Sequence, residues 1–314
     1  TDDASPVAFR TSDKYINYLA DIEQPVLPWE TKPELEKIAS NLSRDVQHYV
    51  VDLQSKAITI PPFHFQEIKG LDADQLKQYI EELRGYRRKL QELETHLEAQ
   101  DIVKIQEYIN ALKGIHQSGN KKSIELEKLA TLALNALNDA LEIKPNYPVG
   151  DDNEPTFTAP ANKPDIECFY EKFNSVCEVT MLTDRSQCYN EGQQVMRHVR
   201  NFENLYSDKT TYCLFIAPRL HQDTVETFWM AIKYGYKGTT QKIVPLSITQ
   251  FIRLLEILLE IRKQGKQFMH DELLRLYEQV LGLTNKVKHS EEWIERIPDT
   301  ISAWQKSILA KQQL

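Results

Sequence analysis

The chain has 314 residues, of which 41% are hydrophobic and 27% are charged, as expected for a globular protein long enough for two domains. No stretch approaches the roughly eighteen consecutive apolar residues of a membrane span, and the first residues lack a signal-peptide pattern. The net charge of −8 argues against a freestanding DNA-binding protein, although residues 182–266 carry an excess of lysine and arginine. We therefore expect a soluble, cytoplasmic protein.

The first part of the chain is predicted to be helical. Residues 1–30 contain several prolines and little periodicity, which indicates an extended lead-in. Thr31 can cap a helix whose apolar residues recur at helical spacing. Two prolines within residues 58–65 end that helix, and a long amphipathic helix begins near Asp72. A further helix is expected over residues 101–114.

A polar, turn-rich stretch at residues 117–123 marks the predicted domain boundary. Residues 1–116 then form an all-helical module, and residues 117–314 form a second domain.

The second domain alternates between helical and strand-like segments. Two short apolar runs joined by a turn predict a β-hairpin over residues 165–182, and the loop before it spans residues 144–163. The order predicts an α+β or α/β domain, in which helices flank a mixed sheet. Its helices are expected at 123–140, from Ser186 onward, and at 222–233, 248–263, 269–281 and 290–310, with further strands at 211–218 and 242–247.

The four cysteines, at positions 168, 177, 188 and 213, show no spacing typical of a zinc site. We expect them to be reduced cysteines in or near the core.

Two acidic residues flank the predicted hairpin. Asp165 begins one strand and Glu178 lies near the end of the next, so the two carboxylates are expected side by side at the open end. Such a pair repels unless a cation lies between the two groups, and Mg²⁺ with oxygen ligands is the usual solution. Val179 can add its backbone carbonyl, whereas Thr180 stands where many nucleases have a lysine.

Two further candidates lie on the helix that follows the hairpin. Glu191 and His198 are seven positions apart and are expected on one helix face. Glu191 can reach a metal or orient a water, while His198 or the neighbouring Arg197 can meet a phosphate. These groups are the parts that metal-assisted phosphodiester hydrolysis needs.

Each of these residues also has an ordinary interpretation. An aspartate after proline often starts a turn, a lone buried histidine is often structural, and a glutamate in a first helical turn stabilises the helix. Glu178 is harder to explain in this way, because its strand is otherwise apolar. The combination favours a nuclease site.

The segment PDIECFYEKFNSVCEVTMLTDRSQCYNEGQQVMRHVRNF, residues 164–202, resembles the catalytic segment of the AlwI-type type IIS restriction endonucleases and related nicking enzymes. That family belongs to the PD-(D/E)XK nuclease superfamily. Its pattern is an Asp after Pro, a Glu followed by Val-Thr, a Glu opening the next helix and a Val-x-Arg-His ending. The matching residues here are Asp165, Glu178, Val179, Thr180, Glu191, Val195, Arg197 and His198.

The resemblance implies a type II, restriction–modification endonuclease that cuts double-stranded DNA with Mg²⁺, as one or two ions that Mn²⁺ can replace. It also implies a bacterial origin and a further acidic residue on the helix before the hairpin, placed at Glu127 with Glu125 as second choice. The expected metal ligands are Asp165, Glu178, Val179 and Glu191, and the expected DNA contacts are Arg185, Arg197 and Arg200.

The helical module resembles the linker between the recognition and cleavage parts of such enzymes. The sequence shows no base-reading module in residues 1–115 and begins at Thr1. We therefore expect a C-terminal fragment that lacks the N-terminal recognition domain. Cutting both strands would require a dimer or a second subunit.

Two other functions remain open at the level of sequence. The long helices allow a non-catalytic interaction protein on a nuclease-like fold. A glycosidase also uses paired carboxylates, but an aromatic-rich substrate groove is missing from the pattern.

Overall fold

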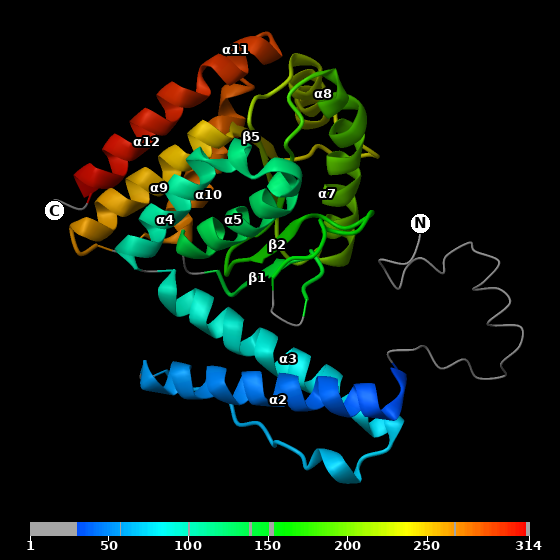
Figure 1. Ribbon diagram of the computed structural model, residues 1–314. Helices are drawn as coiled ribbons and strands as arrows, with labels where there is room; N and C mark the ends of the chain where they lie inside the picture. The colour runs from blue at the N-terminus through cyan, green and yellow to red at the C-terminus, as the bar shows by residue number, and fades with distance from the viewer. Residues whose placement is uncertain are drawn as a thin grey trace, which may run out of the picture. The chain divides into compact units, whose positions relative to one another are not determined.

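Figure 1 shows the computed structural model, which describes residues 30–56, 58–99, 101–137, 140–150, 154–266 and 268–311. Apart from Glu30, the expected lead-in over residues 1–30 lies outside the described residues. The chain divides into two compact units, Thr1–Gln91 and Glu92–Leu314, each with its own hydrophobic core.

The first unit is helical, as predicted. Helix α2 (Lys32–Ser55) begins after Thr31, which occupies the capping position without a capping side-chain bond, and α3 (Ala73–Glu98) follows the short turn η3 (Ile68–Gly70). Between them, Phe63 stacks on Tyr86 with ring centroids 4.4 Å apart. The Tyr86 hydroxyl donates to the Pro61 carbonyl at 2.8 Å, so the proline-containing segment packs on the helices.

The second unit contains the end of α3 and then, in chain order, α4 (Ile102–Lys113), η4 (Ile115–Gln117), η5 (Gly119–Lys121), α5 (Lys122–Ala136), β1 (Glu142–Pro145), β2 (Ile166–Phe169), β3 (Asn174–Val179), α6 (Arg185–Gln187), the π-helix η6 (Cys188–Gly192), α7 (Gln193–Leu205), β4 (Thr211–Ala217), α8 (Gln222–Lys233), β5 (Ile243–Ser247), α9 (Ile248–Lys263), α10 (His270–Leu283), α11 (Ser290–Glu295) and α12 (Ile297–Lys311).

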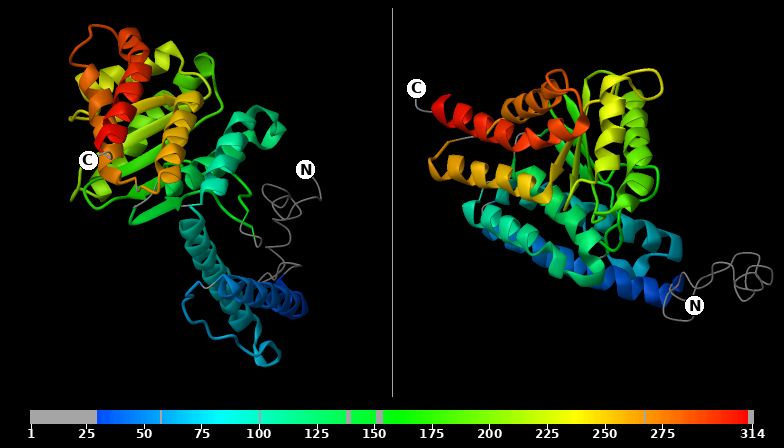
Figure 2. Two further views of the ribbon diagram at one scale, coloured as in Figure 1. Left: turned by 90° about the vertical axis from the view of Figure 1, so that its left-hand side faces the viewer. Right: turned by 90° about the horizontal axis from the view of Figure 1, so that it is seen from above.

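The strands form one mixed sheet in the order β1-β2-β3-β4-β5. Strands β1, β2 and β3 are antiparallel, whereas β3, β4 and β5 are parallel, so the carboxyl ends of the last three meet at one edge. Helices cover both faces of this sheet (Figure 2). The predicted α+β architecture, a helical module and a mixed sheet flanked by helices, is confirmed.

Alternation along β3 separates the two faces. Cys177 and the half-buried Val179 belong to the larger core, which α4, α5 and α9 share, while Val176 belongs to a smaller core with α7 and α8. Glu178 therefore faces α7, because successive side chains of a strand point to opposite faces.

Strand β1 and the C-terminal helix differ from the sequence prediction. Strand β1 was expected to be partly loop, and it is a short edge strand that ends in Pro145, where a proline costs the ladder little. The helix predicted over 290–310 is broken into α11 and α12 at Arg296, two residues before Pro298. A proline belongs in the first turn of a helix and not in its middle, which explains the break.

The predicted boundary after residue 116 does not coincide with the division between the compact units, which falls within α3. The polar stretch at 117–123 forms the short turns η4 and η5, and the preceding helix α4 packs against α9. The assignment of residues 117–314 as the functional domain remains a prediction.

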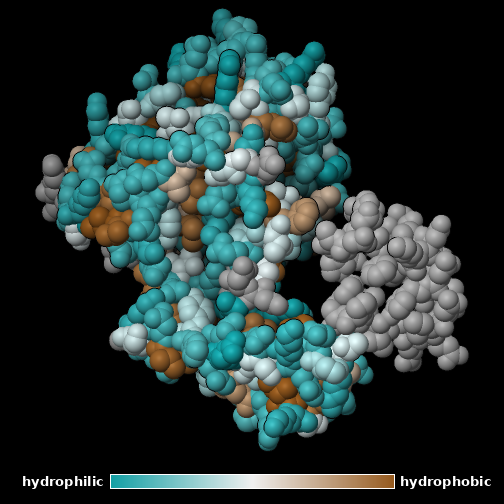
Figure 3. All heavy atoms as spheres, in the orientation of Figure 1, coloured by the Kyte–Doolittle hydropathy of each residue, from teal (hydrophilic) through white to brown (hydrophobic). Residues whose placement is uncertain are grey.

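Among the described residues, no helix has both the length and the apolar character needed to cross a bilayer. The face shown in Figure 3 is largely hydrophilic, with apolar residues in small separate groups. The cysteines at 168, 177 and 213 are buried, the one at 188 is half-buried, and all four are free, as expected.

The smaller core depends on an aromatic pair. Phe215 of β4 and Phe228 of α8 are fully buried and meet edge to face, with centroids 5.0 Å apart. Phe228→Ala should lower the free energy of unfolding of the second unit by about 3–5 kcal/mol, since it leaves a cavity. Urea titration followed by tryptophan fluorescence measures this, because Trp229, Trp293 and Trp304 lie in the second unit.

The matched control is Phe157→Ala, whose ring is 72% exposed. It should change the free energy of unfolding by no more than about 0.5 kcal/mol. Equal losses in the two variants would contradict the assigned core.

Candidate active site

Four carboxyl groups from four elements gather at one edge of the sheet. They come from α5, from the residue before β2, from β3 and from η6, and we call them the carboxylate cluster: Glu127, Asp165, Glu178 and Glu191. The four groups are close enough to affect one another electrostatically. The charges of Glu178 and Glu191 raise the pKa of Asp165, and those of Asp165 and Glu191 raise the pKa of Glu127.

The strand register brings two members of the cluster together. Ile166 pairs with Cys177 in the antiparallel ladder, so Asp165, one residue earlier, lies opposite Glu178 on the same face. The Asp165 carboxylate also accepts a hydrogen bond from the Val179 backbone N–H, at 2.7 Å. This bond locks the open end of the hairpin and leaves the Val179 carbonyl for another partner.

Glu178 is held by a histidine from α7. Glu178 is 3% exposed and His198 is 1% exposed, and Nδ1 of the imidazole lies 2.8 Å from Oε1 of the carboxylate. Burial lowers the pKa of His198 to about 4, with the charge of Arg197 as a second cause, so the ring is neutral at pH 7. A proton on Nδ1 satisfies this bond and leaves the buried Nε2 as an acceptor without a partner among the described residues.

The π-helix η6 places Glu191. Its wider turn interrupts the helix that is predicted from Ser186 onward, and the regular helix α7 begins only at Gln193. The Thr180 hydroxyl hydrogen-bonds the Glu191 side chain, and the same oxygen accepts from the Leu182 N–H at 3.2 Å. Thr180 therefore supports Glu191 by hydrogen bonding where a lysine would add a charge.

Glu127 enters the cluster from the other face of the sheet. Its carboxylate is 3% exposed and accepts a hydrogen bond from the Ala159 N–H at 2.9 Å. Next to it, Lys128 forms an ion pair with Glu154 at 2.5 Å. Both contacts hold the loop before β2 on α5. Ala159 could not be found from the sequence, because it contributes only a backbone group.

Burial and mutual repulsion favour the neutral acids. Burial raises the pKa of Glu127 to about 8, and the charge of Asp165 raises it further, against the Ala159 bond. Burial likewise raises the pKa of Asp165 and Glu178 well above their usual range, helped by the charge of Glu178 and of Glu191 respectively. The pKa of Glu191 is also raised by burial. No lysine or arginine of the described chain forms an ion pair with any of the four.

The oxygen donors of the cluster suit a hard divalent cation such as Mg²⁺. Within the described ranges, however, no three acidic, histidine or cysteine side chains are already placed to hold an ion together. Mg²⁺ is often bound by one or two carboxylates, with the remaining ligands supplied by waters and substrate phosphates. The donor set fits that mode better than a closed protein cage.

The three arginines predicted to contact DNA lie in different surroundings. Arg200 donates to the carbonyls of Tyr236 and Thr239, each at 2.8 Å, and pairs with Glu203, so its guanidinium is engaged within the fold. Arg185 is 71% exposed and lies 3.4 Å from Asp223. Arg197 is half-buried beside His198.

A separate cavity of about 690 Å³ lies at the carboxyl ends of β4 and β5. Its lining includes His116, Pro218, Ser247 and Arg253, and no member of the carboxylate cluster.

The chain was compared with known proteins by sequence and by fold. Residues 4–254 match the AlwI restriction endonuclease family, which is most of the chain. The chain belongs to the AlwI restriction endonuclease family. Membership implies a site-specific DNA endonuclease, so DNA is the expected substrate.

A solved structure shares the fold. The small subunit (R.BspD6I2) of the heterodimeric restriction endonuclease R.BspD6I is similar with a TM-score of 0.53 and 19% sequence identity. The similarity covers 62% of this chain and 97% of that one. No curated protein matches the sequence.

The raised carboxyl pKa values predict how stability depends on pH without metal. A group whose folded-state pKa is raised stabilises the fold below its ordinary pKa, and this contribution is lost as the pH rises through the folded value, about 8 for Glu127. In EDTA, the stability contributed by Glu127 should fall as the pH rises from about 4.5, its ordinary pKa, to about 8, its folded-state pKa, and level off above that. Glu127→Gln should be more stable than wild type at pH 9 and show a smaller fall.

The control is Glu125→Gln, on the same helix but outside the cluster, which should keep the wild-type pH dependence. His198, whose pKa is lowered to about 4, makes stability rise with pH below about pH 6.5, but it does so equally in wild type and variant and therefore cancels in the comparison. An unchanged pH profile for Glu127→Gln would show that Glu127 is not buried among like charges.

Proposed function

We propose that this chain is the cleavage portion of a type IIS restriction or nicking endonuclease, which hydrolyses DNA phosphodiester bonds with Mg²⁺ at a variant PD-(D/E)XK site. The observation that carries the proposal is the carboxylate cluster, in which four acids lie together and no lysine or arginine within the described ranges forms an ion pair with them. A divalent cation would supply the missing positive charge and could also attract the DNA phosphate.

Asp165, Glu178, the Val179 carbonyl and Glu191 would hold the metal, as one or two ions, and Mn²⁺ should replace Mg²⁺. When bound, the metal polarises a phosphoryl oxygen and lowers the pKa of a coordinated water. Hydrolysis of a phosphodiester needs both effects near neutral pH.

The other residues position these ligands. His198 fixes one oxygen of Glu178 at 2.8 Å, and its burial favours this role over direct contact with a phosphate. Thr180 orients Glu191, which is then placed to hold a water. Asp165, tied to the Val179 N–H through one oxygen, has the other oxygen available. Glu127 holds the loop at Ala159 beside the same edge.

A single site of this kind cuts one strand. Double-strand cleavage would therefore require a second copy or a second subunit. The structural similarity to the small subunit of a heterodimeric restriction endonuclease supports the second arrangement. Sequence recognition would come from a part of the enzyme outside this chain.

The decisive experiment is cleavage of supercoiled plasmid with Mg²⁺, with Mn²⁺ and with EDTA. Glu178→Gln should lower the rate at least about 100-fold, because a neutral amide is a poor ligand for a hard cation. Cutting should require Mg²⁺ or Mn²⁺ and stop in EDTA.

Glu167→Gln is the matched control, since Glu167 is also a buried strand glutamate but bonds Asn146 outside the cluster. It should cut at close to the wild-type rate. Cutting by Glu178→Gln at the wild-type rate, or cutting in EDTA, would refute the mechanism. DNA binding with no cutting by the wild type would favour a non-catalytic interaction protein.

A further inference from the structure

The turns that follow β3 and β4 are tied together beside the carboxylate cluster. The two strands are parallel neighbours, with Val179 opposite Ile216, and the Thr180 N–H donates to the Ile216 carbonyl at 3.0 Å. Both turns therefore leave the sheet at the edge where Glu178 lies.

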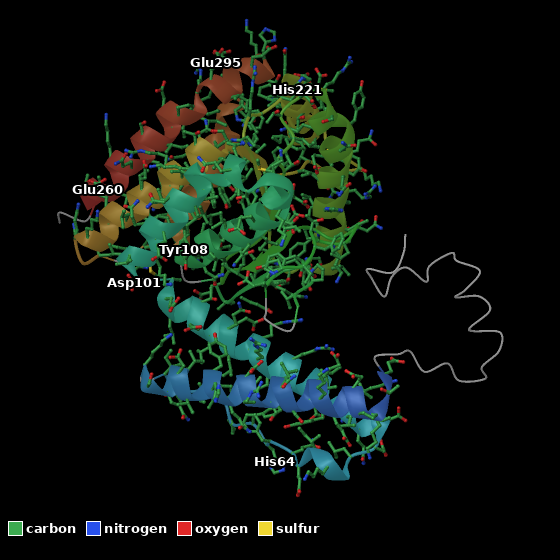
Figure 4. The ribbon with its side chains drawn as sticks, viewed as in Figure 1. His64, Asp101, Tyr108, His221, Glu260 and Glu295 are labelled. Carbon is green, nitrogen blue, oxygen red and sulfur yellow. The ribbon has the colours of Figure 1, made fainter. Side chains whose placement is uncertain are left out.

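Gln187 of α6 forms this tie, and its side chain is fully buried. Its amide nitrogen donates to the carbonyl of Leu182, after β3, at 2.6 Å and to that of Arg219, after β4, at 2.9 Å. Its oxygen accepts from the His221 N–H at 2.9 Å. Figure 4 labels His221, which caps α8. All three bonds of the amide go to backbone groups, so they fix the path of the two turns.

The turn after β4 presents Arg219 to solvent. Arg219 is exposed, and no acid forms an ion pair with its guanidinium in the part of the chain that the structure describes. It follows Ile216 by three residues, which is roughly 10 Å of extended chain. Two of the arginines predicted to contact DNA differ from Arg219, because Arg185 lies near Asp223 and Arg200 is bound to carbonyls and Glu203.

An unpaired arginine at this position matches the chemistry of the substrate. Four acids repel the DNA backbone, so a cation beside them is needed to hold the strand in place. A guanidinium binds a phosphate through two parallel hydrogen bonds, and each DNA strand carries one phosphate per 3.4 Å of helix axis. The phosphates flanking the one at the cluster are therefore the candidate partners of Arg219.

We propose that Arg219 binds a DNA phosphate flanking the cleaved bond, and that Gln187 is the positioning residue that holds its turn beside the carboxylate cluster. This inference rests on the proposed function, because it takes DNA cleavage at the cluster as given. It assigns the substrate contact to the turn after β4.

The test is binding of the full chain to a short duplex of arbitrary sequence, measured by fluorescence anisotropy in Ca²⁺ at several salt concentrations. Arg219→Gln should weaken binding about tenfold at low salt and reduce the slope of log K against log salt by about 0.9, the value for one lost phosphate contact. Arg219→Lys should keep the wild-type slope, since it keeps the charge.

Arg275→Gln is the matched control. Arg275 is also a partly exposed arginine, but it lies on α10, which contacts the closed end of the hairpin through the pair Lys172–Asp271. It should leave affinity and slope unchanged. If the wild-type chain binds and cuts DNA, and Arg219→Gln has the same dependence of log K on log salt as the wild type, this proposal alone is overturned. A wild-type chain that neither binds nor cuts contradicts the proposed function as well.

The role of Gln187 is tested with Gln187→Ala, or with the isosteric Gln187→Glu where the alanine variant does not fold. The slope of log K against log salt should fall by the same amount as in Arg219→Gln. The double variant, with both Gln187 and Arg219 changed, should show no further fall, because the two changes remove the same phosphate contact. Gln241→Ala is the control, as Gln241 is also buried and donates to the Met196 carbonyl at 2.7 Å. It should lower thermal stability without changing the slope. A purely structural Gln187 would behave as Gln241 does, and that result would overturn its positioning role.

Discussion

The gathering of four carboxyl groups at one edge of a sheet, two of them buried and two half-buried, is the constraint on which the rest of the site depends. Two unit charges 4 Å apart near a protein surface interact by about 4 kcal/mol, so carboxylates held together are costly unless protons or cations neutralise them. The fold holds the four acids together against this repulsion, and each acid comes from a different part of the chain. The hairpin register fixes Asp165 against Glu178, while α5 and η6 contribute Glu127 and Glu191.

Thr180 makes this site electrostatically different from a nuclease site that has a lysine at the same position. A lysine ammonium would neutralise part of the cluster permanently. Thr180 instead hydrogen-bonds Glu191 and leaves the total charge unchanged. Among the described residues, the basic side chain that contacts the cluster is that of His198, whose lowered pKa keeps it neutral. The balance of charge is therefore left to protons and cations that bind reversibly, and a bound cation could attract both the acids and an anionic substrate.

Much of the fold could be predicted because local patterns determine it. Apolar spacing gave α8 and α9 their observed limits, and alternation with an intervening turn gave the hairpin and hence the pairing of Asp165 with Glu178. The prediction was weaker where tertiary context decides. Edge strand β1 has little apolar signal, and the π-helix η6 has no simple pattern of residues. The engagement of Arg200 depends on carbonyls of residues 236 and 239, which are distant in sequence.

The π-helix has a consequence for how this segment can vary. Each residue of an α-helix advances the direction of its side chain by roughly 100°, so one residue added or removed rotates everything that follows by that angle. Glu191 lies within η6 and His198 lies beyond it on α7, and both are aimed at the same edge of the sheet. Substitutions between them can be absorbed by local packing. A change in length by a single residue would turn one of the two away, so the spacing of this segment is more constrained than its composition.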